Sequence, residues 1–152
     1  MQARSSIVIA ASPETVFGFI ADPANDRRWR THLVACHGVV RGTGSRVTQT
    51  YSFQGRTQTV DLEVSEYEPP TRLTYRVASG PVRARLAFQC LPDAGGTRVG
   101  FSASATLAGP AALLGGRITS EATKLARADL ERLKRVLESA ASGDSSTGAD
   151  LP

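Results

Sequence analysis

The chain has 152 residues, the length of one domain, and 18 Lys and Arg against 14 Asp and Glu give a formal net charge of +4. Its two cysteines, Cys36 and Cys90, match no metal-binding or redox spacing and are interpreted as small buried apolar residues of a reducing compartment. The densest basic run, at residues 27–30, is one helical turn long and holds one aromatic residue. A nucleic-acid groove needs a longer basic stripe with several stacking aromatics, so we expect no nucleic-acid partner.

The hydropathy of the sequence predicts no membrane-spanning segment. No apolar run approaches the roughly 18 residues that a membrane-spanning helix needs, and the first residues lack the apolar stretch of a signal peptide. We therefore expect a soluble, cytoplasmic protein without a membrane span.

The first thirty residues predict one strand and two short helices. Residues 5–10 are rich in β-branched side chains and predict a strand. Ser12 followed by Pro13 is a helix start, and Asp22 followed by Pro23 repeats that signal. The first helix therefore ends near Ala21, and a second, shorter helix runs to about residue 29.

The middle of the chain predicts an antiparallel sheet. Short turn segments separate six further runs of strand length, at residues 33–40, 45–54, 58–67, 72–78, 82–91 and 97–107. Alternating polarity gives each strand one apolar face. The opposite face carries charged residues of both signs, which we interpret as cross-strand ion pairs, with an anion site as the less favoured alternative: Asp61, Glu63, Arg76, Arg83 and Arg85.

The C-terminal part predicts one long amphipathic helix from Gly109-Pro110 to about Ala140. Asp129 falls inside its apolar stripe, where an unpaired carboxylate is costly. We therefore expect Asp129 to be the buried partner of an arginine or of an indole N–H. The residues beyond Ser139 have almost nothing to bury, so residues 141–152 are expected to be a disordered tail.

Four motifs carry a resemblance to a known family. They are residues 7–29 (IVIAASPETVFGFIADPANDRRW), the Gly44 turn before SRVTQTYSF, YEPPTRLTYRV, and GGTRVGFSASATL followed by the closing helix. Over roughly residues 4–139 the chain resembles the START-like helix-grip superfamily, in particular the polyketide cyclase/dehydrase and lipid-transport (SRPBCC) type. The resemblance implies an α+β helix-grip fold in one domain, residues 1–140. In that fold a seven-stranded curved antiparallel sheet wraps around a long C-terminal helix, and two short helices lie between strands 1 and 2.

The resemblance also implies a deep, mainly apolar cavity between the sheet and the long helix. The apolar faces of the strands then give candidate ligand-binding residues. Gln49, Tyr51 and Tyr75 are the expected polar contacts, and Trp29 is interpreted first as a wedge that seals the second helix against the sheet. The full candidate set is Trp29, His32, Val47, Gln49, Tyr51, Leu62, Tyr75, Leu86, Phe88, Phe101, Leu114 and Ile118.

No sequence pattern requires catalysis. Cys36 and His37 are adjacent and point to opposite faces of a strand, and the chain has too few histidines at suitable spacing for a metal site. We expect no cofactor and no metal. If the protein is an enzyme, the weak catalytic candidates are His32, Tyr51, Tyr75 and Asp129.

Three functions remain open at this stage. The favoured one is non-catalytic binding or carriage of a small hydrophobic molecule, lipid-like or polyketide-like, by a monomer or homodimer. The alternative is a polyketide cyclase, aromatase or dehydratase that acts on a ligand in the same cavity. A third is a protein-interaction module of the co-chaperone kind, which would need an exposed apolar patch.

Overall fold

The computed structural model describes residues 2–53, 55–77, 83–106 and 115–150, with the backbone alone for Phe53, 115–118 and 141–150. The order of elements predicted from the sequence is confirmed. The elements are β1 (Gln2–Ile9), α1 (Pro13–Ile20), η1 (Pro23–Asn25), α2 (Asp26–Trp29), β2 (Leu33–Gly38), β3 (Arg46–Phe53), β4 (Arg56–Glu68), β5 (Arg72–Val77), β6 (Arg83–Asp93), β7 (Gly96–Thr106) and α3 (Gly115–Asp150).

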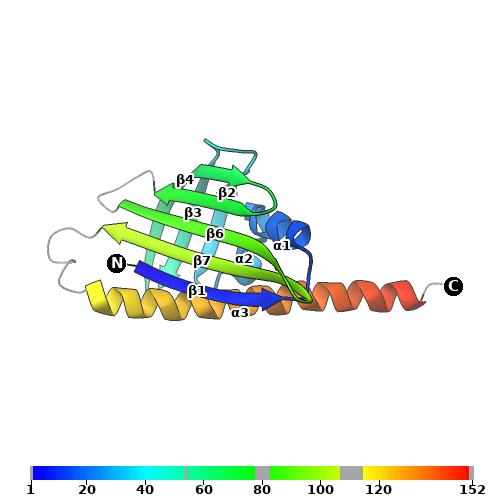
Figure 1. The fold of residues 1–152 in the computed structure, drawn as a ribbon. Coiled ribbons are helices and arrows are strands. Elements are labelled where there is room, and N and C mark those ends of the chain that lie inside the picture. Colours follow the sequence, from blue (N-terminus) through cyan, green and yellow to red (C-terminus); the bar gives the residue numbers. More distant parts are fainter. Residues whose placement is uncertain (1, 54, 78–82, 107–114, 151–152) are drawn as a thin grey trace.

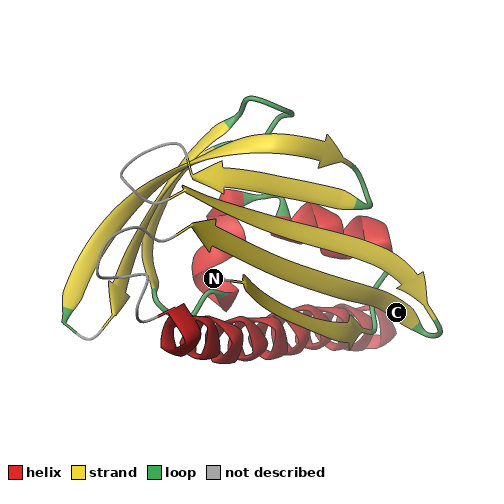
Figure 2. Cartoon of the chain, turned by 60° about the vertical axis from the view of Figure 1, so that its left-hand side comes forward, coloured by secondary structure: helices red, strands yellow, loops and turns green. Residues whose placement is uncertain are grey.

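The seven strands form one antiparallel sheet in the order β1-β7-β6-β5-β4-β3-β2. The last strand returns beside the first, so the two edges of the sheet are β1 and β2. The sheet curves strongly, and the helices lie on its concave side and along its β1 edge (Figures 1 and 2). This is the helix-grip arrangement expected above.

Both predicted helix starts are capped as expected. The Thr15 N–H donates to Ser12 Oγ over 3.2 Å at the start of α1, and the Ala24 N–H donates to Asp22 Oδ1 over 3.0 Å at the start of η1. The second predicted helix is a single 3₁₀ turn that continues into the four residues of α2. These brief segments change the chain direction twice inside the concave side of the sheet, which one straight helix could not do.

The β1 edge is covered by α3, which lies alongside it (Figure 1). Lys134 Nζ donates to the Val8 carbonyl over 2.9 Å, and the Ala10 N–H donates to Glu138 Oε2 over 3.1 Å. Lys134 and Glu138 also form an ion pair of 2.6 Å. The polar face of α3 thereby hydrogen-bonds backbone groups at the end of an edge strand, which would otherwise be open to pairing with other chains.

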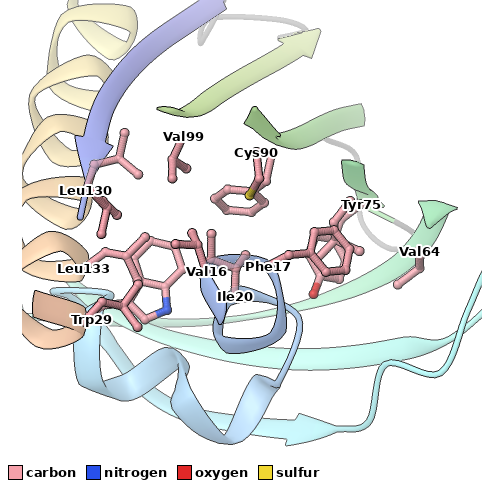
Figure 3. Close-up of a cluster of buried hydrophobic side chains, with 14 of the residues drawn as sticks. Val16, Phe17, Ile20, Trp29, Val64, Tyr75, Cys90, Val99, Leu130 and Leu133 are labelled. Carbon is pink, nitrogen blue, oxygen red and sulfur yellow. The ribbon is translucent and has the colours of Figure 1, made fainter. Parts of the chain in front are cut away.

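A continuous core joins the sheet, the short helices and α3. Trp29 extends from α2 toward Leu130 and Leu133 of α3 (Figure 3). Its ring meets Phe88 of β6 edge-on, with centroids 5.9 Å apart, and is 2% exposed. The single tryptophan of the sequence is therefore the wedge that was predicted, because it seals α2 against both the sheet and α3.

The outer face of the sheet carries cross-strand ion pairs, as the alternation predicts. Glu63 lies opposite Arg76 in the register and pairs with it at 3.1 Å. Glu66 pairs with both Arg72 (3.5 Å) and Arg85 (2.6 Å). A shallow hollow of about 680 Å³ on this face is bordered by Arg4, Arg72 and Arg85, and Glu66 pairs with the last two. Cross-strand pairing therefore accounts for Glu63, Arg76 and Arg85, while an anion site at the hollow stays the alternative.

The C-terminal end of α3 differs from the predicted end. The structure continues this helix to Asp150, about ten residues beyond the predicted end, and no proline interrupts the sequence before Pro152. The disordered tail at residues 141–152 stays a prediction. The predicted start at Gly109-Pro110 lies outside the described residues. Within the described ranges, no helix combines the length and hydropathy that crossing a bilayer requires.

Two glycines make a matched test of the packing. A Cβ at Gly96 would lie 2.0 Å from the Ile9 carbonyl oxygen, whereas a Cβ at Gly18, in α1, meets nothing within 4 Å. We expect Gly96→Ala to lower the free energy of unfolding by roughly 2 kcal/mol or more, because the backbone at Ile9 or at Gly96 must move to make room for the added methyl group. Gly18→Ala should raise it by about 0.5–1 kcal/mol, because alanine favours the helix. Urea unfolding measures both, and a neutral Gly96→Ala would contradict the close packing of the β6–β7 turn against the end of β1.

Candidate functional site

A cavity of about 230 Å³ lies between α3 and the sheet. One water occupies roughly 30 Å³ in the liquid, so the cavity has room for a small organic molecule. Its wall comes from α2, β3, β6, β7 and α3. The lining residues are Trp29, Arg30, Tyr51, Leu86, Phe88, Phe101, Ala103, Ala122, Leu125, Ala126, Asp129 and Leu130.

The register of two strands brings the apolar wall together. Leu86 of β6 lies opposite Ala103 of β7, and Phe88 lies opposite Phe101 two residues along, with ring centroids 5.0 Å apart. Residues two apart share one face of a strand, so all four side chains face α3.

Small side chains keep the space open. Ala122 and Ala126 are four residues apart on α3 and therefore lie on one face of the helix, and Ala103 faces them from β7. Larger residues at these positions would fill the gap between helix and sheet. The cavity thus follows from the alanines that both sides present to each other.

One end of the cavity is polar and is built on a buried ion pair. Arg30 Nε donates to Asp129 Oδ2 over 3.1 Å, and the two side chains are 12% and 7% exposed. Asp129 Oδ1 also accepts from the Thr31 N–H over 2.9 Å and from the Thr31 hydroxyl. The prediction that Asp129 is the buried partner of an arginine is confirmed.

Hydrogen bonds continue from this ion pair to a second buried carboxylate. Arg30 Nη2 donates to the Tyr51 hydroxyl over 3.3 Å, and that hydroxyl donates to Gln49 Oε1. Gln49 Nε2 then donates to Asp26 Oδ2 over 3.0 Å. The Cys36 thiol lies 3.9 Å from the same oxygen. The chain of donors therefore runs from the cavity through β3 to the start of α2.

Burial changes the titration of this cluster. Loss of hydration raises the pKa of Asp26 from 3.8 to about 7, although the Arg30 charge and the Gln49 amide oppose that rise. Burial also raises the pKa of Tyr51, against the nearby Arg30 charge, and raises the pKa of Cys36 to about 11. At neutral pH the phenol and the thiol stay protonated, and Asp26 is the group of this cluster that titrates.

Asp26 Oδ1 and Trp29 Nε1 are buried and lack a hydrogen bond of normal geometry among the described residues. The indole N–H still lies near enough to the Asp26 carboxyl to oppose the rise of its pKa, together with Arg30 and Gln49. An unbonded carboxylate oxygen is costly when it is charged, which agrees with the raised pKa of Asp26.

The predicted site residues divide into three groups. Trp29, Tyr51, Leu86, Phe88 and Phe101 line the cavity. Leu114 and the side chain of Ile118 lie outside the described residues. The remaining predicted residues do not line the cavity: His32, Val47, Gln49, Leu62 and Tyr75.

Three of the residues that do not line the cavity lie elsewhere in the core. Val47, Leu62 and Tyr75 do sit on the apolar face, and they belong to the buried cluster that also contains Phe17, Ile20 and Trp29. Gln49 is fully buried behind Tyr51, and His32 lies in the turn before β2. The alternation of a strand identifies its buried face and does not identify which stretch of that face stays uncovered.

Sequence reasoning missed Arg30 and the alanines as site residues. Arg30 belongs to a basic run that is typical of a solvated turn, and its burial depends on Asp129, 99 positions away. Ala122 and Ala126 follow helical spacing on the apolar side of α3, and their small size was the available signal.

The site offers binding surface and hydrogen-bond donors. Among the described residues, no three His, Cys, Asp or Glu side chains gather where they could hold a metal ion. The lining carboxylate, Asp129, already accepts three hydrogen bonds. Arg30 and the Tyr51 hydroxyl are therefore the groups that can orient a guest molecule.

Comparisons with known proteins agree with this architecture. Residues 1–138 match the family model described as "Polyketide cyclase / dehydrase and lipid transport". The comparison with curated proteins gives no match.

Solved structures share the fold at low sequence identity. TTHA0849 from Thermus thermophilus is similar with a TM-score of 0.79 and 21% identity, covering 91% of this chain and 99% of that one. SA2116 from Staphylococcus aureus, a protein of unknown function, gives a TM-score of 0.76 at 9% identity over 93% and 96% of the two chains. NE0264 from Nitrosomonas europaea gives 0.74 at 15% identity over 93% and 97%.

Because the pKa of Asp26 is raised, we expect replacement of this residue to increase the free energy of unfolding by an amount that depends on pH. In the unfolded chain this carboxyl ionises above pH 3.8, whereas in the folded chain it stays protonated up to about pH 7. Its contribution to stability is therefore fully present below pH 3.8 and is lost as the pH rises through 7. We expect Asp26→Asn to be more stable than wild type at pH 8, by up to about 4 kcal/mol, and to lose that advantage near pH 4.

Urea unfolding at a series of pH values measures this difference. Asp22→Asn is the matched control, because asparagine is an equally good N-cap, and it should change stability by less than about 0.5 kcal/mol at either pH. A difference between Asp26→Asn and wild type that does not vary with pH would refute the buried, protonated carboxyl.

Proposed function

Because the chain belongs to the polyketide cyclase/dehydrase and lipid-transport family, we propose that it binds a small hydrophobic molecule in the cavity between α3 and the sheet. The observation that carries this proposal is the cavity of about 230 Å³, whose wall is apolar except at Arg30, Tyr51 and Asp129. Apolar pockets with a few polar groups at one place are typical of small-molecule sites.

The size of the cavity limits the guest. Ligand pockets commonly have roughly 300–1,000 Å³, so the described cavity lies just below the range for drug-sized molecules. A molecule of one or two fused rings, or a short branched chain, is the expected size. A long-chain lipid would need more room than the described residues provide.

The protonation and the hydrogen bonds of the polar groups favour a function in binding over a function in catalysis. Tyr51 stays protonated at neutral pH because burial raises its pKa, and Asp129 is held by Arg30 and Thr31. Asp26, which titrates near neutrality, lies behind Gln49 and Tyr51 and does not line the cavity. A general base would need direct reach to a guest, or reach through one water.

One observation supports the alternative function, that of a cyclase, aromatase or dehydratase. The hydrogen-bond chain from Asp26 to Arg30 ends at the cavity, so the charge state of Asp26 can influence the groups that contact a guest. That alternative predicts that Tyr51→Phe abolishes a reaction while binding remains.

Naphthalene is a suitable neutral probe of the cavity. Trp29 is the single tryptophan of the sequence and lines the cavity, so its indole N–H gives one isolated NMR cross-peak in the ¹⁵N-labelled protein. We expect naphthalene to shift this peak in a saturable way. Ala126→Phe, which fills the cavity from α3, should weaken binding at least about ten-fold, because the guest loses the buried volume it would occupy.

Ala128→Phe is the matched control. It adds the same side chain two residues further along α3, at an exposed position, and should leave naphthalene binding unchanged. Equal binding by Ala126→Phe and wild type, or no saturable shift in wild type, would refute the proposed site.

A further inference from the structure

The Arg30 guanidinium has hydrogen-bond donors that the protein does not use. A guanidinium carries five N–H groups. Among the described residues one is donated to Asp129 and one to Tyr51, and the remaining three find no partner. The Arg30 side chain is 12% exposed and lines the cavity, so bulk water reaches these donors poorly. A guest in the cavity can reach them.

The acceptors at the same end of the cavity are occupied. Asp129 accepts from Arg30 and twice from Thr31. The Tyr51 hydroxyl accepts from Arg30 and donates to Gln49. The protein therefore presents spare donors and few spare acceptors, and the complementary group on a guest is an oxygen acceptor.

The charge of the site favours a neutral acceptor over an anion. Arg30 and Asp129 are the charged residues of the cavity lining, and they cancel each other. A carboxylate on the guest would enter an apolar space with a negative charge that no additional cation offsets. Asp26, beyond Gln49, adds further repulsion whenever it is ionised.

The ring contacts of Arg30 hold the guanidinium in place. It lies over the Trp29 ring at 5.1 Å and over the Tyr51 ring at 5.9 Å from the centroids. Together with the hydrogen bonds to Asp129 and Tyr51, these contacts fix the direction of the free N–H groups. A guest then gains hydrogen bonds to a charged group without ordering a flexible side chain.

We propose that the cavity selects an uncharged, mainly apolar molecule whose carbonyl oxygen accepts hydrogen bonds from Arg30, and that it rejects the corresponding carboxylate. This inference rests on the proposed function, because it specifies the guest of the same cavity. The predicted guest is a small aromatic or branched ketone, aldehyde or ester that fits about 230 Å³.

Three naphthalene derivatives of nearly equal shape test the inference: 2-acetylnaphthalene, 2-isopropylnaphthalene and 2-naphthoate. Equilibrium dialysis at pH 7 gives the three dissociation constants for the wild-type protein. We expect the ketone to bind at least about ten-fold more tightly than the hydrocarbon, the factor that hydrogen bonds to a charged group typically give. We also expect it to bind at least about ten-fold more tightly than the carboxylate, whose buried charge no additional cation offsets.

A matched pair of variants separates the role of Arg30 from general hydrophobicity. Arg30→Lys keeps the positive charge beside Asp129 but lacks the planar fork of donors. The preference for the ketone over the hydrocarbon should fall at least about five-fold in Arg30→Lys. Arg27→Lys, the same change at an exposed position of α2, should leave that preference unchanged.

The outcomes distinguish the inference from the proposed function. If the ketone and the hydrocarbon bind but the carboxylate binds as tightly as the ketone, the inference is wrong and the cavity remains a binding site. A ketone preference that survives in folded Arg30→Lys also overturns the inference. If none of the three molecules binds, the proposed function and the inference fail together.

Discussion

The ion pair between Arg30 and Asp129 is the contact on which the site depends. It joins the end of α2 to the middle of α3 across 99 positions of sequence, and both side chains are largely removed from water. A carboxylate inside the apolar stripe of a helix is costly unless a cation and donors meet it, and here Arg30 and Thr31 do so. α3 is therefore held in a position where Asp129 faces the end of α2.

That position divides the concave side of the sheet into a filled part and an open part. α1, η1 and α2 fill one part with Phe17, Ile20 and Trp29, which pack against the sheet (Figure 3). Over the other part α3 presents alanines, and Ala103 faces them from β7. The polar end of the cavity lies at the boundary between the two parts. The ion pair thus holds α3 in place and supplies the donors that face a guest.

The sequence was informative wherever a local rule applied. Ser12 and Asp22 identified the helix starts, alternation identified the apolar face of every strand, and the conflict between Asp129 and its helix face identified a buried pair. Which stretch of an apolar face stays uncovered depends on contacts between distant parts of the sequence. The sequence therefore could not show that Phe88 and Phe101 line the cavity and that Val47 and Tyr75 do not. Arg30 and Asp26 were missed as polar partners because a four-residue helix has too few turns to show a buried side. Only the fold, which brings β3 and α3 to α2, buries them.

A double-mutant cycle between Arg30 and Asp129 tests the central claim most directly. Arg30→Met and Asp129→Leu each leave one buried charge without its partner, whereas the double variant leaves none. We predict that each single variant loses about 3–5 kcal/mol in urea unfolding and that the double variant loses less than the sum by at least about 2 kcal/mol. Additive losses would mean that the two side chains do not stabilise each other, and would contradict this account of how α3 is positioned and how the cavity is formed.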